Sequence, residues 1–462
     1  MKILFLYQYE YIEPISIMAL SAFLKQNGHN CFFIDLALEN DYLTAIQNIN
    51  PDIIAYSITT GKHIYYQQLN LKLKRKFKFI SIFGGPHTTF FPEFIEEKGV
   101  DVICRGEGEY ALLEFVEAMQ SNKDYIGIKN LWIKNNGKIY RNDVRPLIED
   151  LDSLPFMDRE ILNRYKHYQQ QHRRVMLSGR GCPYKCSYCF NHTYNALYNG
   201  KGKIVRKRSV GNVLQELKIV SNKYNPKRFH FIDDTFILDQ SWCLDFCAHY
   251  QEKIGKEFIV YTRVNLVTDE IVRKLKQAGC ITILYAIESG NEYIRNTILE
   301  RGITNEQILN AVAIYKKYRL RTYAQNMVGI PDETMDMVFE TVKLNIECKP
   351  DYAWCSIFQP YPRTKLWNYC KEKDYLSNEE FDESYHKKSI LRIPRRMEME
   401  NLHHLFSITV SFPILLSLIK IIIKLPLSMF YYIVWQLHRA YSYFFKVKWL
   451  DLSEIFIREN NK

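Results

Sequence analysis

Three cysteines at short, regular spacing are the residues of this 462-residue chain most able to do chemistry. Cys182, Cys186 and Cys189 lie four and three positions apart, so their thiolates can reach one compact metal centre as soft donors. A structural zinc site is closed by four protein ligands, and His192 could supply the fourth. An iron–sulfur cubane held by three cysteines would instead leave one iron open to a small molecule. The spacing predicts a metal centre and leaves both identities open.

The other cysteines carry a weaker signal. The chain has 11 in total, an odd number, and its first residues do not form a secretory signal, because Glu10 and Glu13 interrupt a short apolar run. We therefore expect a reducing, cytoplasmic compartment, where clustered cysteines more often serve metal or redox chemistry than disulfides. Isolated cysteines such as Cys31 are interpreted as small buried hydrophobes.

The first 120 residues alternate short apolar runs with amphipathic stretches, the pattern of a parallel sheet with crossover helices. The expected strands are residues 2–7, 31–36, 52–58, 79–83 and 101–104. Ligands of an open parallel sheet bind at the carboxyl ends of its strands, so we expect a bulky ligand on the loops after the last three. Those loops contain Ser57, Thr59, Thr60, Gly84, Gly85, Pro86, His87, Gly106, Glu107 and Gly108. A tight turn alone could also explain the adjacent glycines.

A second alternating region runs from about residue 174 to residue 369. Its expected strands are residues 174–178, 229–233, 259–264, 282–287, 322–328 and 353–359. Six such units predict an incomplete parallel barrel with its functional residues at the carboxyl ends of the strands. Between the two regions we expect a hairpin over 131–141 and an exposed linker over 149–172.

The cysteine pattern resembles the signature of the radical S-adenosylmethionine (SAM) superfamily, Cys-x3-Cys-x2-Cys with an aromatic residue, here Tyr188, before the last cysteine. Segments similar to those of that family follow in order at 231–236, 261–264, 286–290, 301–304, 329–334 and 360–364. Residues 1–150 look like the cobalamin-binding half of the subfamily that joins both domains. The resemblance implies a Rossmann-like cobalamin-binding domain over 1–148, a linker over 149–172, a partial (β/α)6 TIM-like barrel over 173–375 and a helical extension over 376–462.

The resemblance also implies roles for residues of the second region. Cys182, Cys186 and Cys189 would hold a [4Fe–4S] cluster whose open iron binds SAM, and electron transfer from the cluster would release a 5′-deoxyadenosyl radical. Asp233 or Asp234 would accept from the SAM ammonium, Glu288 from the ribose, and Arg263 or Arg301 would pair with the carboxylate. Tyr188 and Ser289 are further expected SAM contacts. Structural ion pairs or strand-end caps remain the alternative for these residues.

One sequence motif of cobalamin-binding proteins is absent from the first 150 residues. No Asp-x-His-x-x-Gly motif occurs in the first 150 residues, so the sequence offers no histidine that would ligate cobalt from below. Radical enzymes of the resembled subfamily commonly lack that motif, so its absence is compatible with cobalamin on the loops around Ser57, Gly85 and Gly106.

The last part of the chain is unusually apolar. Residues 401–450 contain no Asp or Glu but include Lys420, Lys424, Arg439, Lys446 and Lys448. Lys420, Lys424 and Pro426 interrupt the apolar run, and tyrosines and tryptophans flank it. We expect helices over about 402–450 that lie in a membrane interface, with an apolar cap over the barrel mouth as the alternative.

Composition and charge indicate which class of binding partner to expect. The net charge is +11, but the acid-free tail among apolar residues favours a membrane surface and not nucleic acid. The leading hypothesis is a cobalamin-dependent radical SAM enzyme that methylates an unactivated carbon of a small or lipid-like substrate. An oxidative cyclase without methyl transfer is the second hypothesis, and a zinc-stabilised binding protein is the third. The resemblance further implies an electron donor such as flavodoxin or ferredoxin, and we expect a peripheral location on the inner face of a membrane.

Overall fold

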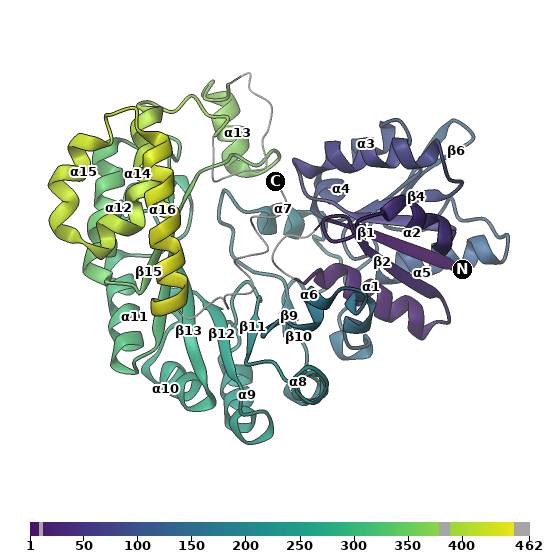
Figure 1. Ribbon diagram of the computed structural model, residues 1–462, viewed down its shortest axis with the longest axis horizontal. Coiled ribbons are helices and arrows are strands. Elements are labelled where there is room, and N and C mark those ends of the chain that lie inside the picture. Colours follow the sequence, from purple (N-terminus) through teal and green to yellow (C-terminus); the bar gives the residue numbers. More distant parts are fainter. Residues whose placement is uncertain (9–12, 378–388, 448–462) are drawn as a thin grey trace. The chain divides into compact units, whose positions relative to one another are not determined.

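The computed structural model describes residues 1–8, 13–377 and 389–447, and it separates into two compact units (Figure 1). The first unit contains residues 1–171 and 193–208, and the second contains essentially all the rest. The chain therefore leaves the second unit directly after the cysteine segment and returns to it at Ser209.

The first unit is built on a seven-stranded sheet with the order β2-β1-β3-β4-β5-β6-β7. Its strands are β1 (Lys2–Tyr7), β2 (Asn30–Asp35), β3 (Ile53–Ser57), β4 (Ile80–Gly84), β5 (Val102–Cys104), β6 (Leu131–Asn135) and β7 (Lys138–Arg141). The first five are mutually parallel, as predicted, and the hairpin of β6 and β7 adds two antiparallel strands. The turn is Asn136-Gly137, and both residues have positive φ, as a two-residue hairpin turn requires.

Helices cover both faces of this sheet. They are α1 (Ile15–Gln26), α2 (Tyr42–Ile49), α3 (Lys62–Lys74), α4 (Pro86–Phe90) and α5 (Glu109–Gln120). One apolar cluster joins Phe5 and Phe33 to α1 and α5, and another joins Leu4 and Tyr56 to α2 and α3. Burial on both faces explains why these strands are continuous apolar runs in the sequence.

The segment expected as an exposed linker packs within the first unit. Ile161, Leu162 and Tyr165 are buried in the core of that unit, and the short helix α6 (Lys166–Gln169) lies in the same segment. Arg159 forms a buried ion pair with Glu13, with the Nη1 and Oε2 atoms 2.7 Å apart. The residues 149–171 are therefore part of the first unit, because apolar side chains at their centre complete its core.

The second unit is built on a six-stranded parallel sheet with the order β15-β14-β13-β12-β11-β8. Its strands are β8 (Arg173–Met176), β11 (Arg228–Phe231), β12 (Glu257–Thr262), β13 (Cys280–Glu288), β14 (Arg321–Val328) and β15 (Tyr352–Ile357). Each overlaps a range predicted from the sequence. The remaining strands are the two-residue β9 (Gly179–Arg180) and β10 (Arg206–Lys207), which were not predicted.

Side-chain caps define where the helices of this sheet begin. The helices are α8 (Val210–Tyr224), α9 (Gln240–Lys253), α10 (Asp269–Ala278), α11 (Asn305–Lys317) and α12 (Met335–Cys348). The side chains of Ser209, Asp239, Thr268, Thr304 and Thr334 each accept a backbone N–H of the first turn. These caps satisfy N–H groups that lack partners in the helix and fix the loop before each helix.

A helical extension covers the β15 edge of the second sheet. It follows α13 (Lys365–Glu372) and contains α14 (Arg396–Ser411), α15 (Leu416–Ile422), α16 (Ser428–Tyr441) and a last π-helical turn (Ser442–Lys446). Helix α14 packs on β15 and α12, and α16 lies beside α14 (Figure 1). An edge strand has unpaired backbone groups, so this cover protects it from pairing with another chain. The described part of the chain contains no helix with the length and apolar character needed to cross a membrane. Lys448 lies outside the described residues.

Candidate active site

The three cysteines occupy one loop of the second unit, between β9 and α7 (Phe190–Leu197). Cys186 is buried, and Cys182 and Cys189 are partly exposed. Burial, together with the neighbouring charges of Cys186, Asp234 and Cys182, raises the pKa of Cys189 to about 12. The backbone N–H of Asn191 donates to the sulfur of Cys189 over 3.5 Å. The fold thus brings the three thiols into one electrostatic neighbourhood.

Arg263, which follows β12, attaches to this loop in two ways. Its guanidinium lies 3.7 Å from the ring centroid of Tyr184, and its Nη1 lies 4.0 Å from the sulfur of Cys186. A third contact runs from its Nη2 to the carbonyl of Arg301. Arg263 is buried, and its Nε has no hydrogen-bond partner among the described residues. A buried cation with a spare donor beside three thiols suits an anionic group bound there.

Glu288, Arg301 and Tyr188 form a buried polar network at the end of β13. Tyr188 donates its hydroxyl to Glu288 Oε1 over 2.9 Å, and Arg301 Nη1 donates to the same oxygen over 3.1 Å. Burial raises the pKa of Glu288, while Arg301 and the Tyr188 hydroxyl lower it. A β-bulge between Ala286 and Glu288 gives Glu288 a positive φ of 64°. The bulge turns the carboxylate toward the cysteine loop that contains Tyr188.

The two expected aspartates have different surroundings. Asp233 accepts the backbone N–H and the hydroxyl of Ser178 over 3.0 and 2.6 Å, so it ties the end of β11 to the end of β8. The Asp234 side chain is exposed to solvent. The surrounding protein nevertheless removes part of its hydration, which raises its pKa, and the charge of Asp233 raises the pKa as well. Asp234 also acts on the pKa of Cys182 and Cys189. Its place beside the thiols makes Asp234 the better candidate for contact with a bound cation.

These residues have the chemistry of an iron–sulfur site. Among the described residues, no three His, Cys, Asp or Glu side chains lie close enough to hold one metal ion. A cubane does not require such convergence, because each thiolate binds a different iron. Three soft thiols together with the spare donor of Arg263 satisfy the chemistry of a [4Fe–4S] cluster with an anionic ligand on its fourth iron.

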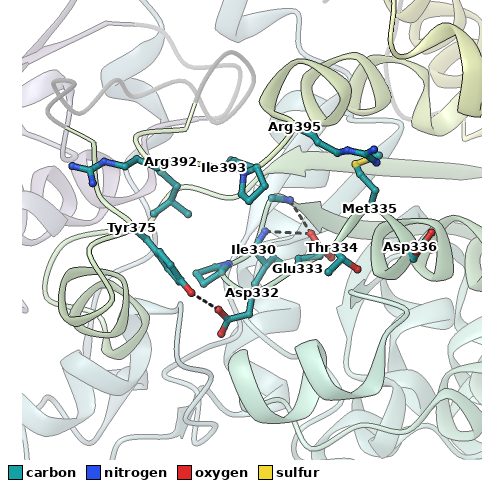
Figure 2. A pocket seen from close by; sticks show the side chains of 14 residues that line it. Ile330, Asp332, Glu333, Thr334, Met335, Asp336, Tyr375, Arg392, Ile393 and Arg395 are labelled. Carbon is teal, nitrogen blue, oxygen red and sulfur yellow. Dashed lines mark hydrogen bonds between the residues drawn. The ribbon is translucent and has the colours of Figure 1, made fainter.

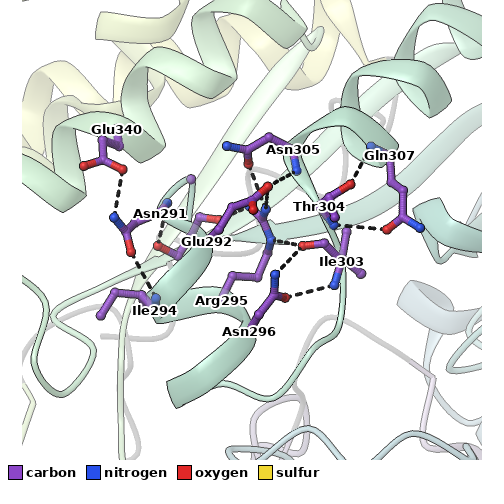
Figure 3. Close-up of polar contacts among 12 residues, drawn as sticks. Asn291, Glu292, Ile294, Arg295, Asn296, Ile303, Thr304, Asn305, Gln307 and Glu340 are labelled. Carbon is purple, nitrogen blue, oxygen red and sulfur yellow. Dashed lines mark hydrogen bonds and ion pairs between the residues drawn. The ribbon is translucent and has the colours of Figure 1, made fainter.

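Sequence reasoning missed Arg295, which organises the loop between Glu288 and Arg301 (Figure 3). Its guanidinium is fully buried and donates over 2.7 Å to the carbonyl of Ser289 and over 2.7 Å to the carbonyl of Ile303. It also donates to the side chain of Asn305 over 2.8 Å. The expected SAM contact Ser289 is thus held through its carbonyl, and its N–H bonds back to Ile287. No local motif marks Arg295, because its partners lie on both sides of a π-helical turn.

A cavity of about 390 Å³ lies at the carboxyl end of β14 (Figure 2). Its lining residues come from 329–336, Tyr375 and 391–395. Asp332 accepts the hydroxyl of Tyr375 over 2.6 Å, and Glu333 accepts the backbone N–H groups of Gly329 and Ile330. Burial raises the pKa of Glu333 to about 8. A cavity at this end of the barrel is where a substrate would be expected.

In the first unit, two of the three predicted loops meet at the β3–β4 edge. The Ile58 N–H donates to the Gly84 carbonyl over 2.9 Å, and the His87 N–H donates to the Ile58 carbonyl over 3.0 Å. Gly85 has φ +95°, and a Cβ added there would lie 2.8 Å from the Ile58 carbonyl oxygen. Only glycine fits this contact, so its role here is more than a tight turn.

Side chains of these loops are also connected. The Ser57 hydroxyl lies 3.2 Å from that of Ser16, and Thr60 Oγ1 lies 3.1 Å from His87 Nδ1. The ring of His87 is buried and stacks on His63, with 3.9 Å between centroids. Thr59 and Pro86 lie in the same two loops. Small polar groups and backbone thus line the edge where the strand order of the sheet reverses, beside β1 and β3.

The third predicted loop is occupied by contacts within the unit. Glu107 accepts Arg206 Nη1 over 2.8 Å and the Ile148 N–H over 2.9 Å, and both side chains of this ion pair are buried. The Gly106 N–H donates to Thr89, and a Cβ at Gly106 would overlap the Tyr198 hydroxyl. Gly108 precedes α5. The carboxylate of Glu107 is therefore held by contacts within the unit, and its role as a cobalamin contact stays a prediction.

Comparison with known proteins covers both units. Residues 176–344 match the family model of the radical SAM superfamily, and residues 1–116 match that of the B12 binding domain. An uncharacterized methyltransferase of Pyrococcus horikoshii is 32% identical over 374 residues, which are 79% of each chain. The anaerobic magnesium-protoporphyrin IX monomethyl ester cyclase of Rubrivivax gelatinosus is 26% identical over 381 residues, 78% of this chain and 66% of the cyclase.

The fold also matches a solved structure. The radical SAM methyltransferase TsrM of Kitasatospora setae, with cobalamin and a [4Fe–4S] cluster bound, gives a TM-score of 0.68. The match covers 80% of this chain and 78% of TsrM at 16% sequence identity. At this identity the likeness shows the shared fold.

Proposed function

Because the chain belongs to the radical SAM superfamily and carries an N-terminal B12-binding domain, we propose that it methylates an unactivated carbon of a small or lipid-like substrate. Its cofactors are a [4Fe–4S] cluster, SAM and cobalamin. When bound, the cluster and SAM supply radical chemistry, and cobalamin supplies methyl-group chemistry. The zinc-stabilised binding protein considered from the sequence is wrong, because the cysteine loop lies within the matched radical SAM region.

One observation carries the proposal. The same chain contains the loop of Cys182, Cys186 and Cys189, with Arg263 at 4.0 Å from Cys186, and a region that matches a B12-binding domain. In that region, the loop at Gly85 approaches Ile58 so closely that only glycine fits. The 32% identity to a protein described as a methyltransferase supports methyl transfer over other outcomes.

Residues of this chain would have specific roles in the proposed reaction. The three cysteines would hold the cluster, Arg263 would neutralise an anionic group beside it, and Asp234 would accept from a cation. Glu288 would accept hydroxyl groups, and Arg301 offsets part of the rise in the pKa of Glu288 that burial causes. An external one-electron donor of the flavodoxin or ferredoxin type completes the proposal.

An oxidative cyclase is a second candidate, favoured by the 26% identity to the Rubrivivax cyclase. The chain spans about two thirds of the length of that enzyme, so the identity does not by itself assign the complete cyclase activity to this chain. The two candidates differ in the fate of the SAM methyl group. Methyl transfer places that group in the product, whereas cyclisation leaves the product without it.

The test is anaerobic reconstitution of the full chain with iron and sulfide, then incubation with cobalamin, a low-potential reductant, methyl-deuterated SAM and cell extract. We expect 5′-deoxyadenosine release and a small molecule that carries the deuterated methyl group. Cys186→Ala should abolish iron binding at the loop and deoxyadenosine release, whereas Cys243→Ala, which changes a buried cysteine of α9, should retain both. Deoxyadenosine release without label in any product would favour the cyclase.

A further inference from the structure

Large apolar side chains exposed to solvent gather in one segment of the chain. Of the 19 such residues among those described, 13 lie between Phe412 and Phe445. We call them the apolar patch; they are Phe412, Ile414, Leu418, Ile421, Leu425, Leu427, Met429, Phe430, Tyr432, Ile433, Leu437, Tyr441 and Phe445. Single exposed apolar residues are ordinary, but a dense group of this kind marks an interaction surface.

Helix α16 is apolar on two sides. Tyr431 and Trp435 are buried, and α16 packs with this side on α14. On another side, Met429, Ile433 and Leu437 follow one another at intervals of four residues, with exposures of 72, 51 and 68%. Residues four apart share a helix face, so these side chains form one outward stripe. Internal packing explains the first stripe but not the second, which faces solvent in the described structure.

Helix α15 and the residues before it extend the same surface. Ile414 is 90% exposed and Ile421 is 65% exposed, whereas Ile419 and Ile423 between and after them are buried against α14 and its neighbours. The patch therefore includes α15 and the connections on either side of it. Figure 1 shows α15 and α16 next to α14, at the β15 end of the second unit.

Basic side chains accompany the patch, and acidic ones do not. Lys420 and Lys424 are exposed on and directly after α15, and Arg439 and Lys446 are partly exposed on α16 and the turn that follows. Residues 401–450 contain no Asp or Glu. An apolar surface with only positive charges is complementary to a bilayer whose headgroups are anionic.

We propose that α15, α16 and the turn between them form a docking surface for an anionic lipid bilayer, with the apolar patch in the headgroup region and Lys420 and Lys424 on the lipid phosphates. The proposal places the protein peripherally, on the cytoplasmic face of a membrane. It does not depend on the proposed reaction, because none of these residues belongs to the candidate active site.

The end of the extension packs on the barrel near the amino ends of its strands and not at the mouth, where the cap alternative would place it. Val447 is fully buried with Ile259, Leu284 and Tyr323, on the sheet face away from the core that contains α9 to α11. Tyr443 packs on Tyr323 in the same cluster. Trp435 and His438 of α16 also contact Trp354 and Tyr352 of β15. None of these contacts involves the stripe of Met429, Ile433 and Leu437, which stays exposed.

The experiment is flotation of the full-length protein with vesicles of phosphatidylcholine, with or without added phosphatidylglycerol. We expect the protein to float with the anionic vesicles and to remain partly bound at high salt, because salt screens the lysines but not the apolar contacts. The triple variant Met429→Ser, Ile433→Ser and Leu437→Ser should lower partition at least about a hundredfold. Lys420→Gln with Lys424→Gln should lower it about thirtyfold on anionic vesicles only.

Matched controls address folding and other occupants. Ile64→Ser with Ile219→Ser removes two exposed apolar residues outside the patch, with exposures of 48 and 49%, and should leave flotation unchanged. All variants alter exposed residues, so circular dichroism and iron content should match the parent. A parent protein that stays unbound by anionic vesicles would overturn the proposal. So would a dimer that the triple variant dissociates without any vesicle binding by the parent, because the patch would then cover a second copy of the chain.

Discussion

Arg263 and Cys186 lie with a guanidinium nitrogen 4.0 Å from a thiol sulfur, although they are 77 residues apart in the sequence. The same guanidinium stacks on Tyr184, which stands between the first two cysteines of the loop. Arg263 therefore both neutralises charge at the loop and holds its shape. A positioning role of this kind gives a direct test.

Arg263→Lys keeps the positive charge but removes the planar group that stacks on Tyr184. Partners of metal ligands typically contribute 10- to 100-fold to metal affinity, so we expect iron retention against a chelator to fall by about that factor. The measurement is iron content after timed exposure to a chelator. Arg75→Lys, at an exposed arginine of the first unit, is the matched control. Equal retention by Arg263→Lys and the parent would contradict the role.

Gly290 is predicted to be essential for the position of Glu288. A Cβ at Gly290 would lie 2.6 Å from the Glu340 carbonyl oxygen and from the Thr341 Cα, both backbone atoms of α12. Gly290→Ala should lower the free energy of unfolding by about 1–3 kcal/mol and weaken SAM binding, because the loop must move. Gly211→Ala in α8, where nothing lies within 4 Å, should be neutral or stabilising. Urea unfolding and equilibrium dialysis with SAM measure the two effects.

Gly84 and Gly85 of the first unit provide a test variant and its matched control at adjacent positions. Gly85→Ala would place a methyl group 2.8 Å from the backbone of Ile58 at a φ of +95°, whereas Gly84→Ala meets only ordinary contacts at 3.9 Å or more. We expect Gly85→Ala to weaken cobalamin binding at least about tenfold, by displacing the loop. The change in visible absorbance of added hydroxocobalamin reports binding. Equal titrations of the two variants would remove the β4–α4 loop from the site.

Arg295→Lys should destabilise the second unit although charge is kept. The ammonium of lysine cannot reach the carbonyls of Ser289 and Ile303 together, so one buried acceptor is left without its donor. We expect a loss of about 1–3 kcal/mol in the free energy of unfolding and weaker SAM binding at unchanged iron content. A stability loss without any change in SAM affinity would make Arg295 a purely structural residue.

Glu333 predicts a pH dependence of stability. Burial raises its pKa from 4.5 to about 8, so the folded protein binds a proton that the unfolded chain has released. The free energy of unfolding should therefore fall by a few kcal/mol as pH rises from about 4.5 to about 8 through this group. Glu333→Gln keeps an acceptor for the Gly329 and Ile330 N–H groups and should remove that part of the slope. Denaturation at several pH values tests it, and an unchanged slope would contradict the assignment.

Local pattern accounted for much of the fold. The expected strand 2–7 coincides with β1, and the hairpin expected over 131–141 formed with its turn at Asn136-Gly137. These elements could be predicted because apolar periodicity and turn residues act over a few positions. The cysteine loop could be predicted for the same reason, since its spacing is local.

Long-range contacts account for what was missed. The roles of Arg295 and of the Glu288 bulge depend on partners that only the folded loop brings together. The structural use of Glu107 depends on Arg206, which is 99 residues away. The burial of 149–171 was missed because a Pro- and Asp-containing stretch, typical of linkers, precedes the apolar residues that complete the first core.

Residues 193–208 belong to the first unit although they follow the cysteine loop of the second unit, and this affects how the first unit can be separated from the rest of the chain. Tyr198 and Arg206 complete the loop around Glu107, and Tyr168 donates its hydroxyl to Asp35. A gene fragment cut after residue 148 would encode the sheet without these parts. The cobalamin-binding half therefore cannot be cut out at residue 148 without losing side chains that complete its core and the loop around Glu107.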